Sequence, residues 1–485
     1  MDNKRILFGS LLLIAVNAGY SQSFVEQYQN FKNDIELQYS SFREDCNQKY
    51  AEFLLTAWEW YEGNAPIPLP MDVNPVPPKP YNGEEQDAPI AVEPIAIRPI
   101  DDTPQPLPVE PIKEQTLPDE KYMSFDFYGN TCKVRIPESA KIKVADCSPN
   151  SIASAWQQLS SDVMNNTIRD CLETRIRYNL CDWAYLNYID TLSRQFRTES
   201  NSATLLMAFL YCQSGYEMRL GVDNGKLIML YASNHQIYEK TYYVMDGKNY
   251  YPYGQEPSRS LQICNAQFEG ETPLSLAINS DLLLGDTLSE PRTIESRGYK
   301  PIAATAQTPV ELIKFFDNYP SSAIDNNPLT RWAMYANTPL SSKTKEILYP
   351  SLKKAIIDSE EKEAVGKLLN WVQTGFEYEY DDKVWGHDRA FFAEETLFYP
   401  YCDCEDRSIL FSRLVRDLLN LDVALIYYPG HLATAVCFNQ DVGGDAMMIG
   451  GRKFIVCDPT YIGAPVGRQM PGLEYDKAQS IIVRK

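Results

Sequence analysis

The chain has 485 residues, of which 44% are hydrophobic and 12% aromatic, and this composition is globular rather than disordered. The length predicts two or three domains with a substantial core. The formal net charge of −20 at pH 7 argues against nucleic acid and anionic membranes as partners.

Residues 1–21 have the pattern of a signal peptide. Lys4 and Arg5 precede an apolar run over residues 6–16, and the small residues after it allow cleavage at residue 18 or 21. The apolar run is too short to serve as a transmembrane anchor. We therefore expect an exported protein, periplasmic or extracellular, in a compartment that permits disulfides.

Residues 22–63 contain an internal repeat of eleven residues. FVEQYQNFKND, IELQYSSFRED and CNQKYAEFLLT follow one another directly, and AWEWYEG begins a fourth copy. Eleven residues over three turns is about 3.67 per turn, so equivalent positions stay on one face of a long helix. That face includes Tyr28, Tyr39, Tyr50 and Tyr61. We expect one amphipathic helix ending at Gly63, which packs on the protein's own body or serves for self-association or partner binding.

Residues 64–119 form a proline-rich segment. Between Pro66 and Pro118 lie 15 of the 32 prolines, among acids and short apolar dipeptides. Proline lacks the backbone N–H that helices and sheet ladders need. We therefore expect an extended linker without sheet ladders, either a polyproline-like spacer or a strap along the surface.

The rest of the chain divides into two halves with a similar order of elements. In residues 120–300, helices predicted over residues 151–215 precede the strands KLIMLYA, QIYEKTYYVM and KNYYPY. In residues 301–485, helices over residues 309–376 and 406–420 precede VALIYY, HLATAVCF and KFIVCDPT. Both halves place helices ahead of antiparallel strands. The sequence thus predicts an α+β fold built from a duplicated unit.

The stretch YPYCDCEDRSIL, residues 399–410, carries two cysteines one residue apart. Cys402 and Cys404 are candidates for a nucleophile, for metal ligands or for a disulfide. Cys404 lies at the start of the predicted helix, where N–H groups stabilise a thiolate or an oxyanion. Glu405 and Asp406 suit the positive end of the helix dipole, but they raise the pKa of a neighbouring thiol. A cationic partner is therefore needed for nucleophilic chemistry.

Two residues farther along the chain can complete a catalytic group. His431 opens the strand HLATAVCF, and Asp458 ends the strand in FIVCDPTY, where Pro459 stops the ladder. The carboxylate can hold the imidazole in a useful tautomer. A cysteine, His431 and Asp458 then follow in chain order as nucleophile, base and orienting acid.

These fragments resemble the transglutaminase-like superfamily, whose fold is related to papain-type cysteine proteases. The resemblance covers roughly residues 309–482 and rests on Cys404-Glu405-Asp406, Gly430-His431 and Asp458-Pro459-Thr460. It implies that Cys404, rather than Cys402, is the nucleophile of an exported bacterial enzyme. The chain departs from the family's pattern after the histidine, where a tryptophan is common and this chain has Leu432.

The first half resembles the same fold without the chemistry. Aligning SATLLMAFLYCQSGY with DRSILFSRLVRDLLN places Glu199 or Ser200 where the nucleophile of the second half stands. His235 comes too late to match the second-half histidine, and no Asp-Pro follows it. We interpret residues 120–300 as a degenerate copy, used for packing or substrate binding, with His235 structural.

Several other residues have competing interpretations. A zinc site is an alternative for Cys402, Cys404, Cys437 and Cys457, although Cys-x-Cys is tighter than the usual ligand spacing. Because Cys437 and Cys457 lie in apolar strands, they can equally be buried hydrophobic residues. Cys171 and Cys181 could form a disulfide, but sequence does not assign pairs. We expect no metal and no other cofactor.

Residues flanking the two cysteines could form the walls of the site. The indole N–H of Trp385 can donate to a developing negative charge, and Tyr401 is a second candidate for the oxyanion or substrate wall. His387 lies in the same loop as Trp385, where it is near the cleft mouth or simply exposed.

The leading functional hypothesis is acyl transfer at an amide of a protein or peptide. His431 takes the proton of Cys404, the thiolate attacks the carbonyl, and water or a second amine resolves the thioester. Water makes the chain a peptidase or amidase, and an amine makes it a transamidase. The alternative is a non-catalytic envelope or surface scaffold, which uses the N-terminal helix and the proline-rich segment for assembly and keeps the triad by inheritance only.

Overall fold

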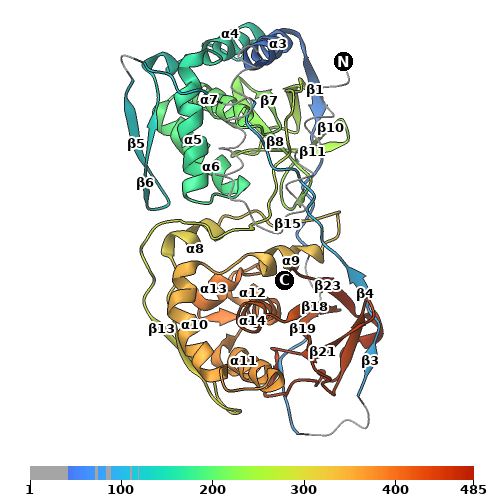
Figure 1. Ribbon diagram of the computed structural model, residues 1–485. Helices are drawn as coiled ribbons and strands as arrows, with labels where there is room; N and C mark the ends of the chain where they lie inside the picture. The colour runs from blue at the N-terminus through green and yellow to red at the C-terminus, as the bar shows by residue number, and fades with distance from the viewer. Residues whose placement is uncertain (1–41, 71–74, 84–88, 110–111, 118–119, 485) are drawn as a thin grey trace.

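The computed structural model describes residues 42–70, 75–83, 89–109, 112–117 and 120–484. These residues form two lobes, each with helices packed on an antiparallel sheet (Figure 1). The predicted α+β class is therefore confirmed. The signal peptide predicted for residues 1–21 and the repeats over residues 22–41 lie outside the described residues.

The N-terminal helix ends earlier than the repeat predicts. In the described part, α3 (Phe42–Thr56) buries Cys46, Tyr50 and Leu54 against the first lobe, with Tyr50 4.7 Å from Trp156 between ring centroids. The helix ends at Thr56, and β1 (Trp58–Glu62) replaces its predicted last turn. β1 pairs antiparallel with β12 (Ser260–Cys264). Aromatic residues favour strands, and the open edge of β12 supplies backbone partners that the repeat period does not reveal.

The first lobe has a six-stranded sheet in the order β1-β12-β7-β8-β11-β10, covered by four helices. Its remaining strands are β7 (Met218–Asp223), β8 (Lys226–Ser233), β10 (Tyr243–Met245) and β11 (Lys248–Pro252). The helices are α4 (Pro149–Leu159), α5 (Asn165–Arg177), α6 (Asp182–Phe196) and α7 (Ser200–Gln213). A separate hairpin joins β5 (Tyr122–Phe127) to β6 (Asn130–Arg135).

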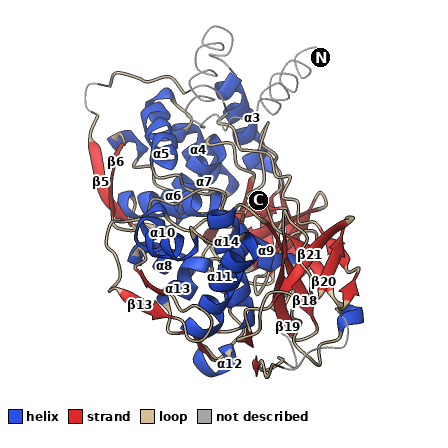
Figure 2. Ribbon diagram, turned by 60° about the horizontal axis from the view of Figure 1, so that its bottom comes forward, coloured by secondary structure: helices blue, strands red, loops and turns tan. Residues whose placement is uncertain are grey.

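The second lobe has a seven-stranded sheet with the helices gathered on one side of it (Figure 2). The strands late in the chain are β18 (Asp422–Tyr428), β19 (His431–Cys437), β20 (Ala446–Ile449), β21 (Arg452–Cys457) and β23 (Gln479–Ile482). The helices are α8 (Val310–Phe316), α9 (Thr330–Asn337), α10 (Ser342–Ile356), α11 (Glu361–Gly375), α12 (Asp381–Val384), α13 (Ala393–Phe398) and α14 (Cys404–Leu419).

Short strand pairs complete the second lobe and join it to the first. β13 (Arg292–Glu295) pairs with β14 (Ala303–Ala306), and β16 (Glu377–Tyr378) pairs in parallel with β17 (Tyr401–Cys402). β15 (Ser322–Ala323) of the second lobe pairs with β9 (Gln236–Ile237) of the first. Backbone hydrogen bonds therefore connect the two lobes directly.

The two sheets share one strand order. After α7, the first lobe runs β12-β7-β8-β11-β10 across the sheet, and after α14 the second lobe runs β23-β18-β19-β21-β20. Every neighbouring pair in both series is antiparallel. Strands that come at the same point in the order of each lobe thus occupy the same place in each sheet, as a duplicated unit predicts.

The proline-rich segment does form sheet ladders, contrary to the expectation for a linker. β2 (Lys79–Pro80), β3 (Ala91–Val92) and β4 (Ile95–Ile97) pair in parallel with β22 (Tyr461–Ile462), β20 and β23. Each strand is two or three residues long and lies at a sheet edge. Proline is tolerated at edges because one side of the strand needs no donor.

The same segment then returns to the first lobe. Val109 N donates to the carbonyl of Gln213 at 3.2 Å, and Leu107 packs directly over Gly215. Gly215 has φ +93°, and a Cβ there would lie 1.8 Å from the Leu107 oxygen. Only glycine fits this close approach. The segment therefore fastens both lobes.

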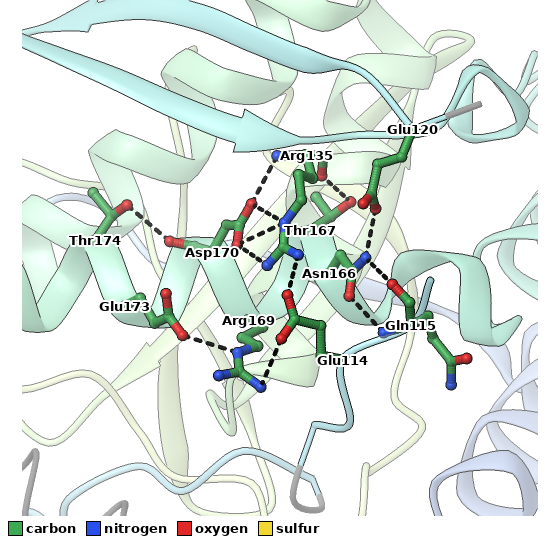
Figure 3. A network of polar contacts seen from close by, with 10 residues as sticks. All are labelled: Glu114, Gln115, Glu120, Arg135, Asn166, Thr167, Arg169, Asp170, Glu173 and Thr174. Carbon is green, nitrogen blue, oxygen red and sulfur yellow. Dashed lines mark hydrogen bonds and ion pairs between the residues drawn. The ribbon is translucent and has the colours of Figure 1, made fainter. Parts of the chain in front are cut away.

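A network of polar contacts anchors the far end of this segment (Figure 3). Asn166 of α5 accepts from Gln115 N at 2.9 Å and donates to the Gln115 carbonyl at 2.8 Å. Arg135 of β6 binds Asp170 of α5 with Nε 3.0 Å from Oδ2, and its guanidinium also pairs with Glu114. Both arginines of the network, Arg135 and Arg169, are paired with carboxylates, so we assign it a structural role.

Candidate active site

Cys404 is the first residue of α14, and the helix start is fixed by its own acids. Asp403 and Asp406 form a capping box in which each carboxylate accepts from the backbone N–H of the other residue. Asp406 also accepts from Phe391 N at 2.8 Å. The aspartate of the Cys-x-Asp motif therefore holds the backbone at the helix start and is fully buried.

His431 and Asp458 meet at the ends of two adjacent strands. Gly430, at φ +78°, makes the turn from β18 into β19, and Asp458 directly follows β21. His431 Nε2 lies 2.9 Å from Asp458 Oδ2, and Asp458 Oδ1 accepts from Thr460 N at 2.8 Å. Both side chains are buried. Because an ionised carboxylate only accepts, the tautomer of a neutral imidazole that fits this contact has its proton on Nε2 and its acceptor at Nδ1.

Cys404 is connected to this pair by Leu432, the residue that follows His431. A hydrogen bond from the Leu432 backbone reaches the Cys404 thiol, and Ser408 of α14 donates to the Leu432 carbonyl at 2.9 Å. The thiol itself donates to Glu405 Oε2 at 3.2 Å. His431 Nδ1 is buried and has no hydrogen-bond partner among the described residues, so no such bond joins it to the sulfur.

The surroundings of Cys404 favour the neutral thiol. Burial, and then the charges of Glu405 and Asp403, raise the pKa of Cys404 well above its ordinary value, while the Leu432 hydrogen bond acts in the opposite direction. Burial and crowding also raise the pKa of Asp381 to about 8 and the pKa of Asp403 well above its ordinary value. Carboxyl groups are thus crowded around the sulfur, as the acids in the sequence predict, and their raised pKa values favour protonated, neutral forms.

Trp385 and Tyr401 make no hydrogen bond or ring contact with Cys404 in the part of the chain that the structure describes. Trp385 packs on Tyr399, at 4.9 Å between ring centroids, and the Arg389 guanidinium lies 4.4 Å above its ring. Tyr401 is 40% exposed in β17. Their proposed roles at the oxyanion or substrate wall therefore have no direct contact to support them.

Two tyrosines that sequence reasoning missed interact electrostatically with Cys404. The charge of Cys404 contributes, after burial, to raising the pKa of Tyr378 and of Tyr380. The alternation FEYEY predicts a strand, but only the parallel pairing of β16 with β17 brings this strand beside Cys402 and Cys404.

The described residues form neither the disulfide nor the zinc-ligand set considered for the cysteines. All eleven cysteines are free thiols, so Cys171 and Cys181 are not bridged. Among the described residues, the groups close enough to hold a metal include Cys404 but not Cys402, Cys437 or Cys457. The zinc set considered from the sequence therefore does not gather. The two groups that do gather are Asp403, Cys404 and Glu405, and Asp381, Asp388 and Glu405.

The first lobe places different residues at the equivalent positions. Lys226 opens β8 where His431 opens β19, and Tyr253 follows β11 where Asp458 follows β21. Asn201 Oδ1 accepts from Leu227 N at 2.9 Å, which is the contact that Cys404 makes with Leu432. Ser200, one of the two predicted residues, opens α7 as Cys404 opens α14, and the next residue, Asn201, makes the equivalent contact to the strand.

The two remaining histidines lie away from this site. His235 is buried in the first lobe, where its Nε2 lies 3.2 Å from Oδ2 of Asp101 in the proline-rich segment. This contact explains its structural role. His387 is exposed, and its Nδ1 lies 3.1 Å from the Trp385 carbonyl.

A cavity of about 1010 Å³ lies between the lobes. Lys226 and Tyr253 line it from the first lobe, and His387 and Asp388 line it from the second, whereas Cys404, His431 and Asp458 are not among the lining residues. An oxygen of Asp388 lies within 4.8 Å of an oxygen of Glu405, and Glu405 accepts a hydrogen bond from the Cys404 thiol. Asp388 and Glu405 thus connect the cavity wall to the sulfur.

The chain matches no protein-family model, no curated protein and no solved structure in the corresponding searches. Across the described residues, no helix is both long enough and apolar enough to cross a membrane. The geometry of the residues therefore carries any functional conclusion.

Proposed function

We propose that this chain is an exported, transglutaminase-like cysteine enzyme that transfers an acyl group from an amide. The observation that carries the proposal is the 2.9 Å contact between His431 and Asp458, which leaves Nδ1 without a partner beside the helix that begins with Cys404. An oriented, unprotonated imidazole nitrogen next to a thiol is the arrangement that nucleophilic catalysis needs.

In the proposed reaction, His431 Nδ1 removes the proton from Cys404 Sγ, and the sulfur attacks the amide carbonyl. The backbone N–H of Cys404, at the start of α14, stabilises the oxyanion. The imidazolium returns its proton to the leaving amine or ammonia as the C–N bond breaks, and a thioester forms. Water or a second amine then attacks the thioester and restores the thiol.

The raised pKa of Cys404 places a requirement on this mechanism. A thiol that is neutral at pH 7 cannot attack until a base takes its proton. The thiol must therefore exchange Glu405 for His431 Nδ1 as its hydrogen-bond acceptor when substrate binds. Hydrogen bonds of this kind commonly tighten only in the substrate complex.

The substrate class that fits is a protein or peptide. The cavity between the lobes has room for an extended chain and presents both charged and aromatic side chains. The charge of −20 disfavours nucleic acid. The described part of the N-terminal helix buries one face on the protein's own body and leaves Phe53 and Leu55 exposed.

The second candidate is a non-catalytic surface scaffold. It is favoured by one observation: Cys404 hydrogen-bonds to Glu405 rather than to His431. On this view, the His431–Asp458 contact stabilises the ends of β19 and β21 and has no chemical role.

Alkylation by iodoacetamide, mapped by mass spectrometry across pH, separates the two candidates. An enzyme shows faster labelling of the buried Cys404 than of the more accessible Cys437, and the rate falls in His431→Ala. A Cys404 that labels no faster than Cys437, with no change in His431→Ala, supports the scaffold.

A further inference from the structure

One buried glutamine holds the loop that carries Asp458. Gln373 of α11 is only 2% exposed. Its Nε2 donates to the backbone carbonyls of Asp458 at 2.9 Å, Tyr461 at 2.8 Å and Ala464 at 3.2 Å. Its Oε1 accepts from Gly463 N at 3.2 Å. A single side chain therefore binds backbone groups along the whole stretch from residue 458 to residue 464.

These contacts use both ends of the amide. A primary amide has two N–H donors and one acceptor oxygen, whereas a carboxylate has no donor and a methionine side chain has neither group in useful strength. Two of the three carbonyls also accept from N–H groups inside the loop, at 3.1 and 3.3 Å. Gln373 therefore ties turns that the loop already forms to the body of the lobe.

The glutamine is itself fixed to the helix that begins with Cys404. Arg407 of α14 is 1% exposed, and its Nη1 donates to the Gln373 carbonyl at 3.2 Å. Its Nη2 donates to the Phe376 carbonyl, directly after α11, at 2.8 Å. A continuous series of contacts thus runs from the start of α14, through Arg407 and Gln373, to the backbone of Asp458.

The position of the Asp458 backbone decides where its carboxylate points. Oδ1 accepts from Thr460 N in the same loop, and Oδ2 meets His431 Nε2. Since His431 Nδ1 has no hydrogen-bond partner among the described residues, the contact with Asp458 selects the tautomer of the ring. A shift of the loop would move the carboxylate and remove that selection.

We propose that Gln373 is a positioning residue, which holds Asp458 where it orients His431; its part in acyl transfer rests on the proposed function. It acts through the backbone of the loop rather than on the reacting atoms. The loop is also held by β2, which pairs with β22. We therefore expect a variant without the amide to fold, with the Asp458 carboxylate displaced.

Gln213 of α7 offers a matched control in the first lobe. It is fully buried, with Nε2 3.1 Å from Asn47 Oδ1 and Oε1 3.0 Å from Asn47 Nδ2. Gln213→Met removes the same chemical groups as Gln373→Met, but at a place where they fasten α3. Both variants should unfold at a lower urea concentration than the native chain, because each loses buried hydrogen bonds.

The tautomer of His431 is the direct measurement. The chain has only three histidines, so ¹⁵N NMR of histidine-labelled protein can resolve each ring, and His431→Ala assigns the signal. Neutral His431 should be in the Nε2–H form in the native chain and in Gln213→Met. In Gln373→Met it should be a mixture with the Nδ1–H form. The native tautomer in Gln373→Met overturns the proposal, as does the same mixture in Gln213→Met.

Activity measures the size of the effect. Incorporation of a fluorescent amine into a generic protein substrate should show kcat/KM lower by about 10–100-fold in Gln373→Met, mainly through kcat, because a misplaced base slows the chemical step rather than binding. Gln213→Met should stay within about threefold of the native chain. Equal losses in the two variants would overturn the proposal, since loss of stability would then explain both.

The positioning role and the acyl transfer can fail separately. A mixed tautomer in Gln373→Met, with Cys404 alkylation that His431→Ala does not slow, supports the hold on Asp458 and removes the enzyme. An unchanged tautomer, with alkylation that His431→Ala does slow, removes the positioning role and keeps the enzyme. Circular dichroism checks folding. If Gln373→Met does not fold, Gln373→Asn, whose amide has a shorter reach, takes its place, with Gln213→Asn as control.

Discussion

The two lobes have one architecture and different residues at the same three places. In each, a buried helix leads into a sheet of the same strand order. The second residue of β8 or β19 donates its N–H to a side chain at the start of that helix. The second lobe has Cys404, His431 and Asp458 at these places, and the first has Asn201, Lys226 and Tyr253. The fold positions the side chains, and their identity alone decides whether nucleophilic chemistry is available.

Both lobes also contain a buried histidine–aspartate contact, but the contacts differ in origin. Asp458 belongs to the lobe's own sheet, whereas Asp101 reaches His235 from the proline-rich segment. The first contact orients the imidazole that we propose as the base. The second fastens a long segment to a lobe, so the same pair of residue types performs two tasks.

The largest effect is expected from replacing the helix-start residue of each lobe. Cys404→Ala should lower acyl-transfer activity by about 10⁴-fold or more, because it removes the nucleophile. Asn201→Ala should change activity by less than about twofold, since it removes only a structural hydrogen bond. Incorporation of a fluorescent amine into a generic protein substrate, and ammonia release, measure both. Similar losses in the two variants would contradict the division of roles.

Asp458→Asn should lower kcat/KM by about 10²–10⁴-fold, because the amide no longer selects the tautomer with a free Nδ1. Iodoacetamide labelling of Cys404 should slow in parallel. Asp101→Asn, at the contact in the first lobe, should leave both rates unchanged. Retention of labelling in Asp458→Asn would remove the catalytic interpretation of the His431–Asp458 contact.

Gly215→Ala should destabilise the fold by about 2–4 kcal/mol, because it combines a disfavoured φ with a clash against Leu107. Gly225→Ala is the matched control: its φ is +76°, but a Cβ there meets nothing within 4 Å, so about 1 kcal/mol is expected. Urea unfolding of both variants measures the difference. Equal losses would show that the proline-rich segment does not press on the first lobe.

Asp101→Asn should destabilise the fold by about 1–3 kcal/mol at pH 7. Burial alone would raise the pKa of Asp101, but hydrogen bonds from His235 and Ser275 outweigh it and hold the pKa well below its ordinary value. Because the folded pKa is below the unfolded value of about 4, the carboxylate stabilises the fold above that pH and loses this effect as the pH falls. The difference between native and variant unfolding free energies should therefore shrink below about pH 4. A difference independent of pH would mean that the contact is not ionic.

Much of the local structure could be predicted from the sequence. The apolar spacing of Leu410 and Leu414 predicts a buried helix, and both side chains are fully buried in α14. The strand ends at His431 and Asp458 follow from glycine and proline positions beside alternating apolar runs. These features depend on neighbours in the chain, and short-range patterns record such neighbours directly.

Other elements could not be predicted, because their partners are distant in sequence. The repeat period favours helix through residue 63, yet β12, about two hundred residues away, pairs with β1. The apolar dipeptides between prolines predict a linker, but in the structure they form strands because β20 and β23 supply open sheet edges. The carboxylates of Asp381, Asp388 and Glu405 are separated in the sequence and gather only when residues 381–388 fold beside the start of α14.

The sequence by itself therefore determined the α+β class, the duplicated order of helices and strands, and the residue types available for chemistry, because periodicity and turn residues act over a few positions. Only the tertiary structure decided which distant backbones pair, which acids crowd together, and that Cys404 contacts Glu405 rather than His431. Those outcomes depend on long-range packing, where small differences in burial and charge select one partner over another.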